Sequence, residues 1–122
     1  MEEYTKKVLL ITKNLMFLPR IEAATGSLGK IKRITDNKNL AAELENSKIL
    51  AVLIDLEDSQ DMWEPILIEL RTLLDNTTIF IAYGPHKNIA LMAKAKKLGC
   101  DHVLAKSAFI SKIRGILKSQ VQ

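Results

Sequence analysis

Five short stretches of the chain have the pattern of β-strands. Residues 7–12 (KVLLIT) and 49–56 (ILAVLIDL) are nearly continuous runs of apolar residues, which is typical of strands buried on both faces of a sheet. Residues 30–35 (KIKRIT) alternate strictly between polar and apolar side chains, which favours a strand at the edge. Residues 78–83 (TIFIAY) and 102–105 (HVLA) complete the set.

The stretches between these strands have the spacing of helices. Apolar residues recur three and four positions apart in residues 17–28, 37–45, 62–74, 88–98 and 108–118, which predicts five amphipathic helices. Gly29 and Gly99 follow two of them, where a helix C-cap favours glycine, and Pro19 places the start of the first helix close to itself. Strict alternation of strands and helices with short connections predicts an α/β fold with a parallel sheet between two helical layers.

Composition narrows the class of protein. Apolar residues make up 48% of the 122 residues, enough for a core, and we expect residues 1–122 to form one domain in the cytoplasm. One cysteine excludes an internal disulfide, and two histidines with one cysteine cannot complete a Cys/His zinc site. The net charge of +4 comes from scattered lysines and arginines, so we expect no nucleic-acid partner. The apolar runs are too short to span a membrane, and we expect no membrane contact, no metal and no cofactor.

Polar side chains collect where the predicted strands end. In open parallel sheets the working crevice lies at the carboxyl ends of the strands, and this rule selects candidates before any family is considered. They are Thr12 and Lys13 after the first strand, Asp55 and Glu57 after the third, Tyr83, Gly84 and His86 after the fourth, and Lys106 and Ser107 after the fifth.

Two of these regions resemble response-regulator receiver domains. Residues 51–56 (AVLIDL) resemble the third receiver strand, which ends in the phosphoacceptor aspartate, and residues 97–107 (KLGCDHVLAKS) resemble the segment that carries the phosphoryl-contacting lysine. The resemblance implies the CheY-like, flavodoxin-like fold with strand order 2-1-3-4-5. It places Asp55 at the phosphoacceptor position and Lys106 at that of the lysine.

The departures from the receiver pattern concern its chemistry. A receiver needs two acids after its first strand to bind magnesium, and here these positions hold Thr12 and Lys13. Tyr83, or Ala82 if the register shifts by one residue, stands at the position of the small hydroxyl residue. Val103 stands at that of the switch aromatic, and Ser107 replaces the proline after the lysine. The resemblance therefore implies the fold without magnesium-dependent phosphotransfer, a degenerate receiver.

Several roles remain open for the crevice residues. Asp55 is either a structural carboxylate paired with Lys106 and Lys13, which would lower its pKa, or an acceptor or anion sensor in which the two lysines replace the metal. Glu57 and its neighbour Asp58 are expected in a solvated loop. Tyr83 and His86 would lie at the rim of the crevice, either beside a rigid Gly-Pro turn or as groups that bind a small molecule.

The leading hypothesis is a signalling module that is not an enzyme and acts through protein contacts. The resemblance implies a protein partner or a homodimer through the fourth helix, fifth strand and fifth helix. Residues 88–98 hold more apolar side chains than one buried stripe needs. The interface candidates are Ile89, Met92, Lys96 and Val103. Residues 15–18 (LMFL) are either a second exposed patch or the first buried helical turn.

Overall fold

A computed structural model describes residues 5–121 and shows five strands that alternate with five helices. The strands are β1 (Thr5–Ile11), β2 (Lys30–Ile34), β3 (Ser47–Asp55), β4 (Ile79–Gly84) and β5 (His102–Ala105). The helices are α1 (Leu18–Thr25), α2 (Leu40–Leu44), α3 (Gln60–Leu73), α4 (Ile89–Lys97) and α5 (Lys106–Val121). Each predicted strand and helix is therefore present.

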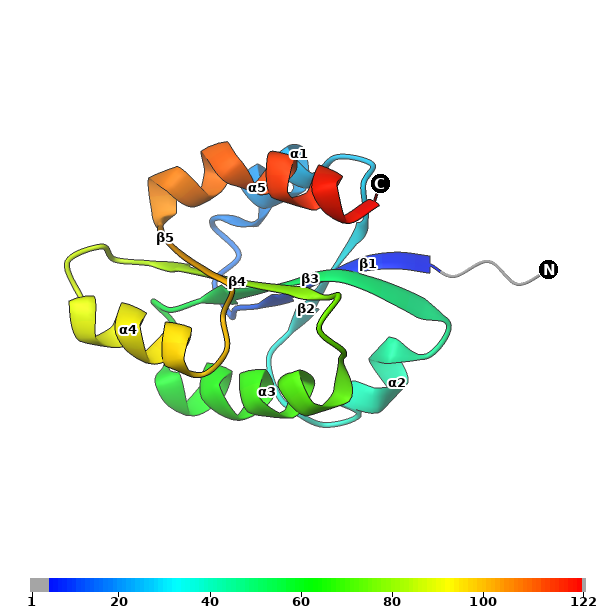
Figure 1. Ribbon diagram of the computed structural model, residues 1–122, viewed down its shortest axis with the longest axis horizontal. Coiled ribbons are helices and arrows are strands. Elements are labelled where there is room, and N and C mark those ends of the chain that lie inside the picture. Colours follow the sequence, from blue (N-terminus) through cyan, green and yellow to red (C-terminus); the bar gives the residue numbers. More distant parts are fainter. Residues whose placement is uncertain (1–4, 122) are drawn as a thin grey trace.

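The strands form one parallel sheet in the order β2-β1-β3-β4-β5. Helices α1 and α5 cover one face of the sheet, and α2, α3 and α4 cover the other (Figure 1). The α/β three-layer fold expected from the alternation is confirmed, and so is the edge position of β2. In the order 2-1-3-4-5 the chain reverses direction across the sheet between β1 and β3, where ligand crevices form in folds of this kind.

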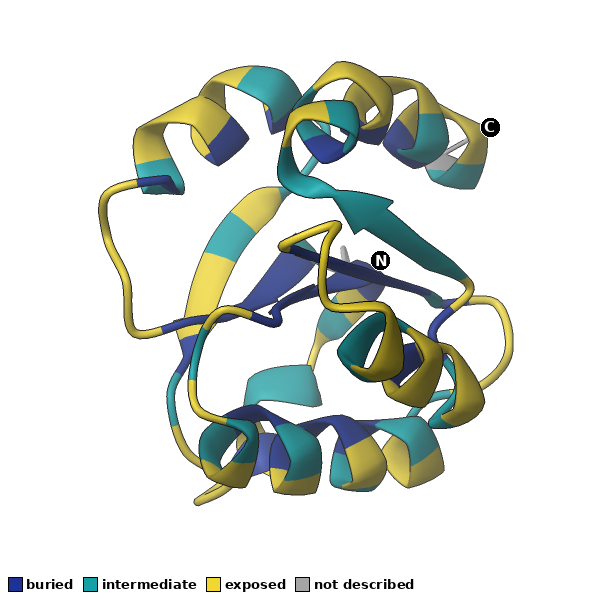
Figure 2. Cartoon of the chain, turned by 90° about the vertical axis from the view of Figure 1, so that its left-hand side faces the viewer, coloured by how far each residue is buried: buried dark blue, intermediate teal, exposed yellow. Residues whose placement is uncertain are grey.

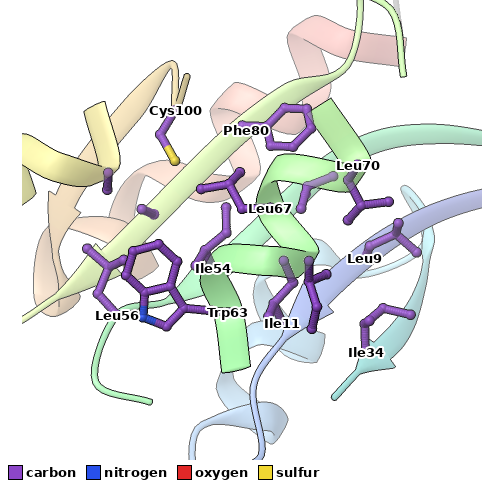
Figure 3. Close-up of a cluster of buried hydrophobic side chains, with 14 of the residues drawn as sticks. Leu9, Ile11, Ile34, Ile54, Leu56, Trp63, Leu67, Leu70, Phe80 and Cys100 are labelled. Carbon is purple, nitrogen blue, oxygen red and sulfur yellow. The ribbon is translucent and has the colours of Figure 1, made fainter. Parts of the chain in front are cut away.

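The apolar runs of the central strands are explained by burial on both sides. Leu9, Ile11 and Ile54 face α2, α3 and α4, and pack with Trp63 and Phe80 in the cluster of Figure 3. The intervening residues of the same strands face α1 and α5, where Phe109, Ile113 and Leu117 belong to a second cluster. Burying one such large apolar side chain contributes roughly 1.5–3 kcal/mol, so a polar replacement on β1 or β3 would damage one of the two layers.

Helix ends differ from the prediction where single residues take left-handed backbone. Gly26 (φ +55°) ends α1 three residues before Gly29, the predicted cap. Asn39 (φ +59°) delays α2, which is only five residues long. Gly99 (φ +111°) follows α4 as predicted, and Pro19 lies in the first turn of α1. Helix α5 begins at Lys106, two residues earlier than expected, so that Lys106 directly follows β5.

Exposure follows the layers. Buried positions line the inner sides of the helices and the centre of the sheet, whereas exposed positions lie on the outer sides of the helices and in the loops (Figure 2). Within residues 5–121, no helix has the length and apolar character needed to cross a bilayer.

Candidate functional site

The ends of β1 and β3 bring Thr12 and Asp55 together. Ile11 and Ile54 are paired in the parallel register, so the residues that follow them leave the sheet side by side. Thr12 is 1% exposed and Asp55 is 1% exposed, although both lie at the edge where the loops begin. The two side chains belong to the crevice that the strand-end rule selected.

The Asp55 carboxylate is held by hydrogen bonds, and within residues 5–121 no lysine, arginine or histidine side chain forms an ion pair with it. Its Oδ1 accepts the backbone N–H of Glu57 at 2.9 Å, and its Oδ2 accepts the Thr12 hydroxyl at 3.0 Å. Burial raises the pKa of Asp55, and the charges of Asp58 and Glu57 act in the same direction, while the two hydrogen bonds oppose them. The neutral form of Asp55 is thus favoured relative to an exposed aspartate.

Asp58 supplies a second carboxylate that contacts the Thr12 hydroxyl. A turn with a 3.2 Å hydrogen bond from the Asp58 N–H to the Asp55 carbonyl folds it back towards β1. Its Oδ2 lies 2.7 Å from the Thr12 hydroxyl oxygen and accepts the Lys13 N–H at 3.0 Å. Thr12 has one hydroxyl hydrogen, so it can donate to only one of the two carboxylates at a time. The sequence had suggested a solvated loop here and gave no sign of this contact.

Lys106 does not reach Asp55. Its Nζ lies 3.0 Å from Glu57 Oε2 and 4.6 Å from the centroid of the Phe17 ring. Among the described residues, the pairing of Asp55 with Lys106 and Lys13 is therefore wrong, and so is the lowered pKa expected from it. The physical reason is competition, because Glu57 is the more exposed partner and pairing there avoids desolvating the ammonium group. The Lys13 side chain is exposed, and only its backbone joins the site.

Tyr83 lies beneath the site rather than at its rim. It is opposite Asp55 in the β3–β4 register, is completely buried, and stacks on Phe109 with ring centroids 4.2 Å apart and an interplanar angle of 16°. Phe17 completes this aromatic cluster, with its centroid 5.6 Å from that of Tyr83. The Tyr83 hydroxyl is buried and has no hydrogen-bond partner within the part of the chain that the structure describes. Burial, followed by the charge of Asp55, raises the pKa of Tyr83.

The remaining crevice candidates are spread along the loops. His86 and Ser107 are exposed. The expected position of Tyr83 beside His86 at the rim is wrong, because Tyr83 is completely buried. Gly84 is buried, and a Cβ on it would lie 2.9 Å from that of Leu56. Within residues 5–121, no three His, Cys, Asp or Glu side chains form a group that could hold a metal ion.

The interface candidates differ in exposure. Ile89 is 77% exposed at the start of α4, whereas Met92 and Val103 are half-buried and pack against the core cluster beneath the helix. Lys96 is exposed, and its Nζ donates to the Asp101 carbonyl at 2.9 Å. Leu15 and Met16 are also exposed, while Phe17 is buried. Residues 15–18 therefore contain both an exposed patch and a core anchor.

Comparison with solved structures agrees with this architecture. The chain is similar to the N-terminal signal receiver domain of a two-component response regulator from Bacteroides fragilis, with a TM-score of 0.74, 14% identity and coverage of 97% and 98% of the two chains. It is also similar to a CheY-like receiver domain from Methylobacillus flagellatus, with a TM-score of 0.69, 22% identity and coverage of 95% and 98%. The fold is that of a CheY-like receiver domain.

A third similar structure is a response regulator whose aspartic acid is phosphorylated. It is a response regulator from Burkholderia pseudomallei with a phosphorylated aspartic acid, a calcium ion and citrate, and it matches with a TM-score of 0.70 and 22% identity over 96% of this chain and 71% of that one. No protein-family profile matches the sequence, and no curated protein matches it. The receiver fold is therefore recognised from the structure.

Proposed function

We propose that this chain is a receiver-like signalling module that acts through protein contacts and does not carry out magnesium-dependent phosphotransfer. The observation that supports this most directly is the surroundings of Asp55. Its Oδ2 is occupied by the Thr12 hydroxyl, a second carboxylate shares that threonine, and the nearby lysine Lys106 is held by Glu57. Phosphotransfer to an aspartate needs positive charge beside the reacting oxygens.

The aromatic cluster supports the same conclusion. A receiver switch moves a small hydroxyl residue from the fourth strand towards the phosphoryl group, as the resemblance implies. Tyr83 at that position is stacked on Phe109 and completely buried, and moving it would leave a cavity in a close-packed layer. The fourth strand is therefore built as fixed core.

The partner surface that we propose consists of α4, β5 and α5. Ile89 supplies an exposed apolar contact at one end, and lysines 94, 96 and 97 form a basic rim. A partner with acidic groups around an apolar centre would complement it. Met92 is half-buried against the core, so only part of its side chain is available to a partner at this surface.

The test of phosphotransfer is a pair of amide NMR spectra of the folded protein. Beryllofluoride with magnesium, and separately acetyl phosphate with magnesium, should leave the signals of residues 12–13, 55–58 and 83–84 unchanged. Local shifts that saturate with magnesium and disappear in Asp55→Asn would overturn the proposal. Inorganic phosphate alone provides a further arm, because shifts at Lys13 and Lys106 without magnesium would indicate an anion sensor instead.

A further inference from the structure

Helices α3 and α4 lie side by side on one side of the sheet, and their outer surfaces point away from it (Figures 1 and 2). An ion pair of 3.2 Å between Lys94 Nζ and Glu64 Oε1 joins the two helices. We call this outer surface the α3–α4 face. It is distinct from the crevice described above. It shares Ile89 and lysines 94, 96 and 97 of α4 with the partner surface proposed above, so a second copy bound here excludes the other partner.

The α3 half of this face is an acidic groove with an apolar floor. The groove has a volume of about 540 Å³ and runs along the outer side of the helix. It is a shallow groove lined by α3 alone, its apolar lining consists of Pro65 and Ile68, and Ile68 is 46% exposed. Asp61, Glu64 and Glu69 line its edges. A large apolar side chain in a groove edged by acids favours a partner with the opposite charge around an apolar centre.

The α4 half of the face has that complementary character. Its outward residues Ile89, Ala90 and Ala93 are exposed, and lysines 94, 96 and 97 follow them. The helix contains no acidic residue, and its basic residues all lie in its last turn. The two halves of the α3–α4 face therefore carry opposite charges around small apolar centres.

We propose that a second copy of this chain binds the α3–α4 face, with α3 of each copy on α4 of the other. A twofold axis that runs parallel to the two helices, between them, places the acidic half of one copy over the basic half of its partner and repeats the contact by symmetry. Such a contact is self-complementary and closes at a dimer. Glu69 is the tenth residue of α3 and Lys97 is the ninth residue of α4, so the axis brings these two turns of the helices to similar heights in the contact.

The first experiment measures the dimer dissociation constant by sedimentation equilibrium at low and at high salt. We expect a dimer that weakens as salt is added, since screening shortens the range of the charges. Ile68→Asn should weaken it by at least about tenfold. Leu73→Asn is the matched control, because Leu73 is on the same helix and is 45% exposed but does not line the groove. A monomer at all concentrations, or equal effects of the two variants, would overturn the proposal.

The second experiment is a charge exchange between the two helices. Glu69→Lys alone and Lys97→Glu alone each place like charges together in a homodimer, and each should weaken it by about tenfold or more. In a mixture of the two variants, both contacts of a heterodimer have opposite charges, so the mixture should recover the dimer. Failure of the mixture to associate more tightly than either variant alone contradicts this arrangement of helices, whatever the outcome of the phosphotransfer test.

Discussion

Replacing Asp55 by asparagine should stabilise the protein at neutral and alkaline pH. The Thr12 hydroxyl oxygen lies within 3.0 Å of an oxygen of Asp55 and of Asp58, so those two oxygens are at most about 6 Å apart. Two unit charges at that distance repel by about 0.7 kcal/mol in water and by about 3 kcal/mol at the effective dielectric typical of proteins. The half-exposed Asp58 places the expected gain between these values.

The hydrogen bonds are preserved in the variant. The asparagine carbonyl can accept the Glu57 N–H, and its amide can donate to the Thr12 oxygen, which leaves the threonine hydrogen for Asp58. The second amide hydrogen of the asparagine gains no acceptor from these contacts, so the expected gain lies towards the lower of the two values.

The gain should depend on pH in a defined direction. Burial raises the pKa of Asp55 in the folded protein above the ordinary aspartate value of 3.8. Its contribution to stability is therefore fully present below that value and is lost as pH rises through the folded pKa. Wild type and Asp55→Asn should have equal free energies of unfolding near about pH 4 and diverge as the pH rises to about 8.

Urea unfolding followed by circular dichroism over this pH range measures the difference. Asp58→Asn should also stabilise the protein, and the double variant should gain less than the sum of the single variants because they relieve the same repulsion. The reasoning is refuted if Asp55→Asn lowers the free energy of unfolding at pH 8 by about 1 kcal/mol or more, since that loss is expected when a buried carboxylate has a cationic partner.

Two further substitutions test the core beneath the site. Tyr83→Phe removes a buried hydroxyl that has no hydrogen-bond partner within the described residues. It should leave the free energy of unfolding unchanged or raise it by up to about 1 kcal/mol; a decrease of about 1 kcal/mol or more would show that the hydroxyl has a partner. Gly84→Ala places a Cβ 2.9 Å from that of Leu56 and should cost about 1–3 kcal/mol, whereas its control Gly115→Ala, with no atom within 4 Å, should gain up to about 1 kcal/mol in a helix; equal melting temperatures for the two glycine variants would contradict the packing argument.

The fold could be predicted from the sequence because its strands are buried on both faces. Continuous apolar runs such as residues 49–56 have few alternatives in a chain without a membrane-length segment. The ends of the helices were less accessible to this reasoning. Gly26 and Asn39 take left-handed backbone and set the ends of α1 and α2. Nearby glycines and asparagines adopt this conformation equally easily, so the sequence does not show which of them ends the helix.

The positions of the site residues could also be predicted, but not their partners. The strand-end rule selected Thr12, Asp55 and Lys106, yet the flexible stem of a lysine can reach several carboxylates, and Glu57 was as close in sequence as Asp55. The burial of Tyr83 had a usable signal, since Ile81 shares its strand face by alternation and belongs to the same cluster. The turn that returns Asp58 to Thr12 had no such signal.

The contacts at Thr12 give Asp55 a structural role that requires no metal ion. Asp55 fixes the start of the β3–α3 loop through the Glu57 N–H, and Asp58 fixes the start of the β1–α1 loop through the Lys13 N–H. The Thr12 hydroxyl lies between the two carboxylates and joins the loops. These roles need hydrogen-bond acceptors and no negative charge, so asparagine can fill either position. The group that joins the two loops is the threonine hydroxyl, so we expect the order of the crevice to depend more on Thr12 than on Asp55.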